Sequence, residues 1–229
     1  MKDFFKKVYS EIAARYELVN HIFSLGLDIF WRKRLARVVV RDGATRVLDL
    51  CTGTGETARC IRRLSRGKVS IVGADFSPEM LNEARKHSGE GIEFELADAL
   101  KLPFADGSFD AVTMSFAARN LNSGEAPLVE YFREINRVIK NGGAFYNLET
   151  SRPSNSFIRA MFRAYVGLLV AIIGKKFSGN DEGYKYLAGS ILEFMGPDEL
   201  SRRLKDAGFS QVSYTKILTG AVAIHKAVK

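Results

Sequence analysis

The chain has 229 residues, 46% of them hydrophobic, which favours one α/β domain with a full core. Its net charge of +8 comes from dispersed lysines and arginines outside any nucleic-acid-binding module, so we expect no nucleic-acid partner. The sequence has no secretion signal, no apolar run near the ~20 residues of a membrane-spanning helix and no CxxC pair, and we therefore expect a cytoplasmic protein without a metal site.

Helices and strands alternate along the first two thirds of the chain. Apolar residues recur at helical spacing over 3–41, with a break near Ser24-Leu25-Gly26. The predicted strands that follow are 46–50, 70–75, 92–98, 109–116 and 144–150. The predicted helices between them are 56–64, a helix that begins at Ser77-Pro78, and 124–139, which Asn141-Gly142-Gly143 ends. This alternation predicts right-handed crossovers and a parallel sheet.

The alternation breaks after residue 150. Residues 152–196 are predicted to form a long, mostly helical insertion, followed by a helix over 197–207 and by strands over 211–218 and 221–228. Because a closing hairpin leaves the parallel pattern, we expect one antiparallel edge strand. The predicted fold is a single α/β domain with a doubly wound, mostly parallel, seven-stranded sheet. Its predicted parts are an N-terminal helical cap (1–41), a cofactor-binding core (42–150), a helical substrate lid (151–196) and a last helix with the closing hairpin (197–229).

The first predicted strand leads into a glycine-rich loop. Gly53 and Gly55 let a ligand approach the backbone in front of a helix N-terminus. Asp75 ends the second strand 20 residues after Gly55, where a doubly wound fold places the carboxylate that binds a ribose. Turn or cap chemistry is the alternative for Asp75, and also for Asp98 at the end of the third strand.

The glycine pattern alone fits a dinucleotide as well as S-adenosylmethionine. Glu56 directly follows Gly55 and disfavours a pyrophosphate at this helix. Asp49 suits the ammonium group of S-adenosylmethionine, and Asp98 can accept a hydrogen bond from an adenine amino group. The closing hairpin is also typical of class I methyltransferases. We therefore expect S-adenosylmethionine as the cofactor.

Several segments resemble a known family. VLDLCTGTGE, GADFSPEML and LADALKLPFADGSFDAV resemble class I S-adenosylmethionine methyltransferases in general. SFAARN, LETSRP, YKYLAGSILEF and RYELVNHIFSLGLDIFW resemble the ubiquinone/menaquinone biosynthesis C-methyltransferase family (UbiE-like), over nearly the full length. This resemblance implies methylation of a ring carbon of a prenylated benzoquinol or naphthoquinol.

The resemblance can be carried over by position. The N-terminal pattern of the family is matched at Tyr16, Asn20, Ser24, Gly26 and Trp31. Glu17 replaces the family's aspartate and Asp28 replaces its histidine. These departures concern the identity of the methyl acceptor. The family's cofactor residues fall on Thr54, Asp75, Asp98, Ala99 and Ser115. We add Phe76, next to Asp75, to the expected cofactor contacts.

Two polar residues follow the fourth strand without a turn residue before them. Arg119 cannot be a conventional base, but it can stabilise the developing phenolate of a quinol. Asn120 can orient the same oxygen or a water. The candidates for the proton acceptor are a water and the tyrosines Tyr16, Tyr184 and Tyr186. A salt bridge to an acid at the sheet edge is the alternative for Arg119.

The segment 157–177 mixes basic residues with a strongly apolar run. One hypothesis is a lid that lies on an anionic membrane surface and admits a polyprenyl tail, with lipid phosphates bound by Arg159, Arg163, Lys175 and Lys176. The alternative is a core helix of the cap. Two other functions stay open: methylation of another lipophilic molecule, and a non-catalytic cofactor-binding module on a membrane. A homodimer also stays open.

Overall fold

The computed structural model describes residues 16–123, 126–176 and 189–229. Within these ranges one sheet has seven strands in the order β3-β2-β1-β4-β5-β7-β6. The strands are β1 (Arg46–Leu50), β2 (Ser70–Asp75), β3 (Glu93–Leu96), β4 (Phe109–Ser115), β5 (Ile139–Thr150), β6 (Gln211–Ile217) and β7 (Val222–Val228). Neighbours from β3 to β5 are parallel, which confirms the doubly wound, mostly parallel fold.

The closing hairpin differs in one respect from the prediction. β7 is the antiparallel strand, and it pairs with both β5 and β6. It therefore lies inside the sheet, and β6 occupies the edge. The prediction that the antiparallel strand is an edge strand is thus wrong. The cause is topological: β7 returns into the place beside β5 and leaves the first strand of the hairpin outside. The expected Thr219-Gly220 turn is the short 3₁₀ helix η2 (Leu218–Gly220).

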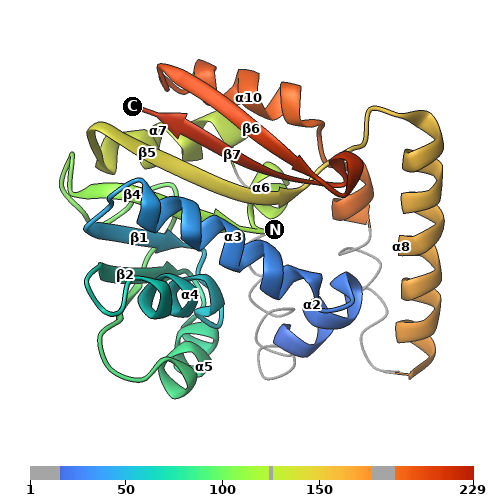
Figure 1. The fold of residues 1–229 in the computed structure, drawn as a ribbon, viewed down its shortest axis with the longest axis horizontal. Coiled ribbons are helices and arrows are strands. Elements are labelled where there is room, and N and C mark those ends of the chain that lie inside the picture. Colours follow the sequence, from blue (N-terminus) through green and yellow to red (C-terminus); the bar gives the residue numbers. More distant parts are fainter. Residues whose placement is uncertain (1–15, 124–125, 177–188) are drawn as a thin grey trace.

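Helices cover both faces of the sheet (Figure 1). On one face, α3 (Leu27–Arg41) and α4 (Glu56–Leu64) bury Trp31, Leu35 and Ile61 in a core with β1 and β5. On the other face, α7 (Leu128–Val138) and α10 (Pro197–Asp206) belong to the second core. α5 (Pro78–Ser88) begins as predicted, since the Ser77 hydroxyl accepts a hydrogen bond from the amide of Met80.

Two predicted helix boundaries can be compared directly. The break in the N-terminal helix is confirmed: α2 (Tyr16–Ser24) ends at Leu25 and Gly26, whose φ angles are 53° and 75°. The predicted end of the helix over 124–139 is wrong in detail. α7 stops at Val138, and Ile139 already pairs with Phe109 as the first residue of β5. Asn141-Gly142-Gly143 therefore lies within the strand.

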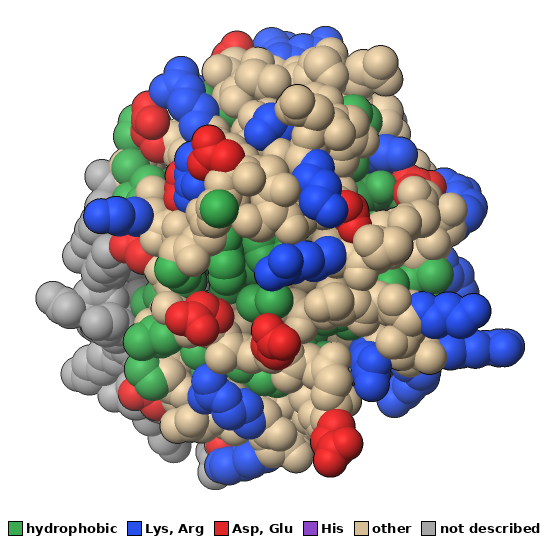
Figure 2. Space-filling view, turned by 90° about the vertical axis from the view of Figure 1, so that its left-hand side faces the viewer, with side chains coloured by type: hydrophobic (Ala, Val, Ile, Leu, Met, Phe, Trp, Pro, Cys, Tyr) green, Lys and Arg blue, Asp and Glu red, His purple; other side chains and the backbone are tan. Residues whose placement is uncertain are grey.

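The insertion contains α8 (Ser156–Lys176), which stands at one end of the molecule (Figure 1). In the described part of the chain, no helix is both long and apolar enough to cross a membrane. Figure 2 shows lysines and arginines spread over one face of the protein, with aspartates and glutamates among them.

Candidate active site

The candidate site lies where β1 and β4 run side by side at the centre of the sheet. Their helices leave toward opposite faces, so their carboxyl ends flank the switch point at which ligands bind in doubly wound folds. Cys51 and Phe116, the residues after the two strands, have φ angles of 53° and 59°. Such left-handed conformations are uncommon for residues other than glycine and cluster at functional sites.

Asp49, near the end of β1, is 1% exposed. Its carboxylate accepts hydrogen bonds of 2.6 Å from the Thr52 hydroxyl and 2.7 Å from the Thr113 hydroxyl. Burial raises the pKa of Asp49 above its ordinary value, because desolvation disfavours the charged form. A bound ammonium group would favour that form, so this carboxylate fits the amino-acid end of S-adenosylmethionine.

Asp75, at the end of β2, connects the glycine loop with α5. Its carboxylate accepts hydrogen bonds of 2.8 Å from the Gly53 amide and 3.0 Å from the Ser77 amide. Burial raises its pKa to about 6. The turn and cap chemistry considered as the alternative is thus present, while the ribose contact stays a prediction.

The other predicted cofactor residues also lie along this edge of the sheet. Gly55 has a φ of 83° and caps α4, directly after the buried Thr54. Ser115 ends β4 and accepts a hydrogen bond of 2.9 Å from the Thr57 hydroxyl, which links it to α4. Phe76 and Asp98 are half-buried, Ala99 is buried, and one Asp98 oxygen accepts a hydrogen bond from the Leu100 amide.

Ion pairs hold the N-terminal helices over this edge. Glu17 of α2 lies 2.8 Å from Arg59 of α4, and Arg59 also donates to the Thr54 carbonyl at 2.6 Å. Burial would raise the pKa of Glu17, but hydrogen bonds from Arg59 and Thr54 lower it below its ordinary value. Arg32 of α3 lies 3.2 Å from Glu56. The substitution at Glu17 is therefore compatible with a cap that is fixed to the glycine loop.

One cluster here has the chemistry of metal ligands. Atoms of Glu17, His21 and Glu56 lie within 4.8 Å of one another. Both glutamates already have an arginine partner, Arg59 and Arg32 respectively. We therefore interpret the cluster as an ion-pair network and assign no metal to it.

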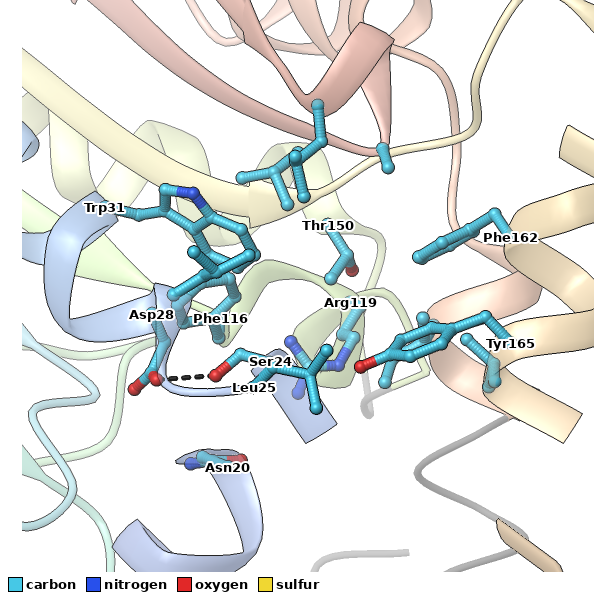
Figure 3. Close-up of a pocket in the computed structure, with 16 residues that line it drawn as sticks. Asn20, Ser24, Leu25, Asp28, Trp31, Phe116, Arg119, Thr150, Phe162 and Tyr165 are labelled. Carbon is cyan, nitrogen blue, oxygen red and sulfur yellow. Dashed lines mark hydrogen bonds between the residues drawn. The ribbon is translucent and has the colours of Figure 1, made fainter. Parts of the chain in front are cut away.

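A pocket of about 220 Å³ opens between the N-terminal helices, the carboxyl end of the sheet and α8 (Figure 3). Its walls are mostly apolar, with Trp31, Phe116, Phe162 and Tyr165 as the aromatic side chains. The full set of lining residues is Asn20, Ser24, Leu25, Leu27, Asp28, Trp31, Phe116, Arg119, Thr150, Phe162, Tyr165, Val166, Ile191, Leu218, Ala221 and Val222. A pocket of this kind, with few polar groups, suits a lipophilic ligand.

Arg119 lines this pocket and is itself 4% exposed. Its Nη1 donates to Glu149 Oε1 at 2.8 Å, and its backbone amide donates to Glu149 Oε2 at 3.2 Å. The salt bridge to an acid at the carboxyl edge of the sheet is thus confirmed. It does not exclude the catalytic role, because an ion pair fixes the orientation of a guanidinium that lines the pocket. That role stays a prediction.

The remaining predicted catalytic residues are placed less directly. Asn120 is half-buried in the short helix α6 (Ala118–Asn122) and is outside the set of described side chains that line the pocket. Tyr184 and Tyr186 lie outside the described residues. Instead, Tyr165 of α8 reaches into the pocket, with its hydroxyl pointing toward Arg119 (Figure 3). Sequence reasoning missed Tyr165, whose one signal was a phenol within an apolar helix.

The comparisons with known proteins agree with this geometry. A family model described as the ubiE/COQ5 methyltransferase family matches residues 2–229. The demethylmenaquinone methyltransferase of Thermus thermophilus is 39% identical over 221 residues, which are 95% of this chain and 98% of that protein. The ubiquinone/menaquinone biosynthesis C-methyltransferase UbiE of Desulfotalea psychrophila is 36% identical over 225 residues, 98% of this chain and 89% of that protein.

Solved methyltransferase structures share the fold. A SAM-dependent methyltransferase from Aquifex aeolicus has a TM-score of 0.56 at 17% identity, covering 84% of this chain and 88% of that one. Human N-acetylserotonin methyltransferase in complex with SAM has a TM-score of 0.65 at 16% identity, covering 98% of this chain and 58% of that one. At these identities the likeness concerns the fold alone.

Proposed function

Because the chain belongs to the ubiE/COQ5 methyltransferase family, we propose that it methylates a ring carbon of a prenylated quinol, with demethylmenaquinol as the first candidate. One observation carries the proposal: a mostly apolar pocket opens at the carboxyl end of the sheet and contains the guanidinium of Arg119. The Thermus thermophilus relative is named for demethylmenaquinone alone, which favours the naphthoquinol, while the name of the Desulfotalea psychrophila relative covers both quinones.

The chemistry required of the protein follows from the two reactants. S-adenosylmethionine, when bound, supplies a methyl group on a positively charged sulfur. The protein must make a ring carbon of the quinol nucleophilic and keep water away from it. Arg119 stays protonated and stabilises negative charge on a phenolic oxygen, while Glu149 holds its orientation. The apolar walls align the ring with the methyl group.

The test is direct. Purified protein is incubated without oxygen with S-adenosylmethionine and a reduced, short-tailed demethylmenaquinol, and the quinone is examined by mass spectrometry. The proposal predicts the gain of one methyl group on the ring and slower turnover of the benzoquinol. Turnover of neither quinol would refute it.

We predict that replacing Asp75 with asparagine weakens S-adenosylmethionine binding roughly tenfold or more, because a hydrogen bond to a charged group contributes ~1.5–3 kcal/mol. Asparagine keeps one oxygen for the Gly53 or Ser77 amide, so the loop is retained. Calorimetry gives the affinity, and Asp106→Asn, at a side chain that is 80% exposed, is the matched control. Equal affinity in the wild type and the Asp75 variant would contradict the ribose assignment.

The same site predicts a pH dependence. The pKa of Asp75 is raised to about 6, and ribose hydroxyls that donate to it would lower the pKa in the complex. The affinity for S-adenosylmethionine is therefore full above pH 6 and declines as the pH falls below it. Asp75→Asn should remove this decline, and persistence of the decline in the variant would assign it to another group.

We also propose that α8 contacts a lipid surface. Its inner face, which includes Val166 and Leu169, is buried. Phe157, Met161 and Leu168 are 71%, 59% and 61% exposed and lie on one stripe of the helix, at spacings of four and seven residues. Arg159 and Arg163 lie roughly 140–180° around the helix from this stripe, so the apolar side chains carry the proposed contact with lipid. Nothing is described of the side chains of Lys175 and Lys176.

The prediction for α8 concerns liposomes. The double variant Phe157→Glu and Leu168→Glu should lose most of its binding to anionic vesicles in a sedimentation assay, because it removes apolar area and adds negative charge. Leu96→Glu is the matched control, since Leu96 is 55% exposed at the end of β3. Equal binding of wild type and double variant would limit α8 to its packing role.

A further inference from the structure

Asp28 provides the single carboxylate among the described residues that line the pocket, and it is separate from the ion pair of Arg119 and Glu149. Its side chain is 3% exposed, so this acid is buried at the wall of a mostly apolar space. Burying a carboxylate costs free energy unless the carboxylate is hydrogen-bonded, and its hydrogen bonds then fix its orientation. Two partners on α2 fulfil this requirement.

These partners form a continuous path from the pocket to the surface. The Ser24 hydroxyl, which also lines the pocket, donates to Asp28 Oδ1 at 2.5 Å (Figure 3). Nδ1 of His21 lies 3.0 Å from Asp28 Oδ1 and 2.9 Å from Oδ2. The His21 side chain is 29% exposed, so the path begins at the pocket wall and ends in contact with solvent.

Charged groups of α2, α3, α4 and α5 surround the path. Arg32 of α3 has its Nε 3.8 Å from Asp28 Oδ2. Glu56 of α4 has its Oε1 3.7 Å from Nε2 of His21. The remaining charged groups nearby are Glu17 of α2, paired with Arg59 of α4, and His87 of α5, which acts on Glu17.

We propose that Ser24, Asp28 and His21 carry the phenolic proton of the acceptor out of the pocket, an inference that rests on the proposed function. The phenol donates its proton to the path, and the ring carbon gains the methyl group as the sulfur–methyl bond breaks and leaves its electron pair on sulfur. The methylated carbon then loses its hydrogen as a proton, the ring regains its aromaticity, and the oxygen regains a proton from the path. One proton is released overall.

Asp28→Asn is the main test, because asparagine keeps the shape and cannot accept the proton. We expect turnover at pH 7 to fall about 10²-fold or more, the usual contribution of acid–base catalysis. The deficit should shrink about tenfold for each pH unit above 7, because more of the quinol ionises unaided as the pH approaches its pKa, near ~10 for a phenol. Affinity for S-adenosylmethionine should stay within error of wild type.

Two further variants separate transfer of the proton from mere packing. His21→Gln should give a smaller loss with the same dependence on pH. Combining His21→Asp with Asp28→His should recover part of the activity that each single change removes, because the pair can form in the reverse sense. A deficit that is equal at every pH, or an exchange without recovery, would overturn the proposal.

A readout without turnover distinguishes failure of this inference from failure of the proposed function. A nitrophenol probe, whose phenolate absorbs visible light, is added to the protein together with S-adenosylhomocysteine. After a rapid rise in pH, the bound probe should ionise faster in wild type than in Asp28→Asn, because the path carries its proton to solvent. This result would support the path even if no quinol is methylated. The same rate of ionisation in both proteins would overturn the path even if quinol turnover is observed.

Discussion

Replacing Arg119 with glutamine should lower turnover on a quinol about 10²-fold or more and leave the affinity for S-adenosylmethionine near normal. The guanidinium faces the pocket, and its interaction with the acceptor's oxygen strengthens as negative charge develops there. An interaction of this kind is made mainly in the transition state, so its loss lowers kcat more than it changes binding. Lysine should restore only part of the rate, because it keeps the charge and loses the planar fork.

The measurement needs a control for the loss of any arginine. Arg133→Gln removes an exposed arginine whose partner is Glu130, in an ion pair far less buried than that of Arg119. Steady-state kinetics well below the unfolding temperature, together with calorimetry of cofactor binding, separates the two effects. A folded Arg119→Gln protein with near-wild-type turnover would show that this arginine serves the structure alone.

Most of the fold was predictable from the sequence because its signals are local. β1, α4 and β2 occupy the residues that were expected of them, since each combines a clear periodicity with glycine or a capping residue at its end. The order of β6 and β7 was not predictable in this way. A hairpin pattern fixes which strands pair with each other, but not which of the two also pairs with β5.

The candidate site was likewise predictable only in the part that depends on local sequence. The predicted cofactor residues lie at or near the ends of strands, so chain order alone placed Asp49 and Asp75 on one edge of the sheet. The acceptor pocket instead depends on how α2, α3 and α8 pack over that edge, which no local pattern encodes. Tyr165 and the contact between His21 and Asp28 were therefore missed, although all three residues are visible in the sequence.

The ion-pair partner of Arg119 was also not predictable from a local sequence pattern. Glu149 lies 30 residues away, at the end of the next strand in the sheet, and reaches Arg119 because β4 and β5 are parallel neighbours. The expectation of a salt bridge named no acid, since several carboxylates follow or end strands. The register of β4 and β5 decides among them, which makes Glu149 the residue on which the orientation of Arg119 depends.

Glu149→Gln should therefore lower the free energy of unfolding by roughly 3–5 kcal/mol, the cost of leaving one member of a buried ion pair without its partner. Glu149 is 1% exposed, and its carboxylate also accepts hydrogen bonds from the amide and hydroxyl of Thr150. For a domain of this size, such a loss corresponds to a drop of about 10 °C in Tm. Thermal unfolding measures it, and Glu130→Gln in the exposed pair should cost less than ~1 kcal/mol.

Combining Arg119→Gln with Glu149→Gln then separates stability from catalysis. The double variant has no lone buried charge, so part of the lost Tm should return relative to either single variant. Turnover should stay as low as in Arg119→Gln, because the neutral pair cannot stabilise a phenolate. If turnover returned together with stability, the guanidinium would act only by holding the pocket in shape, and the electrostatic role of Arg119 would have to be abandoned.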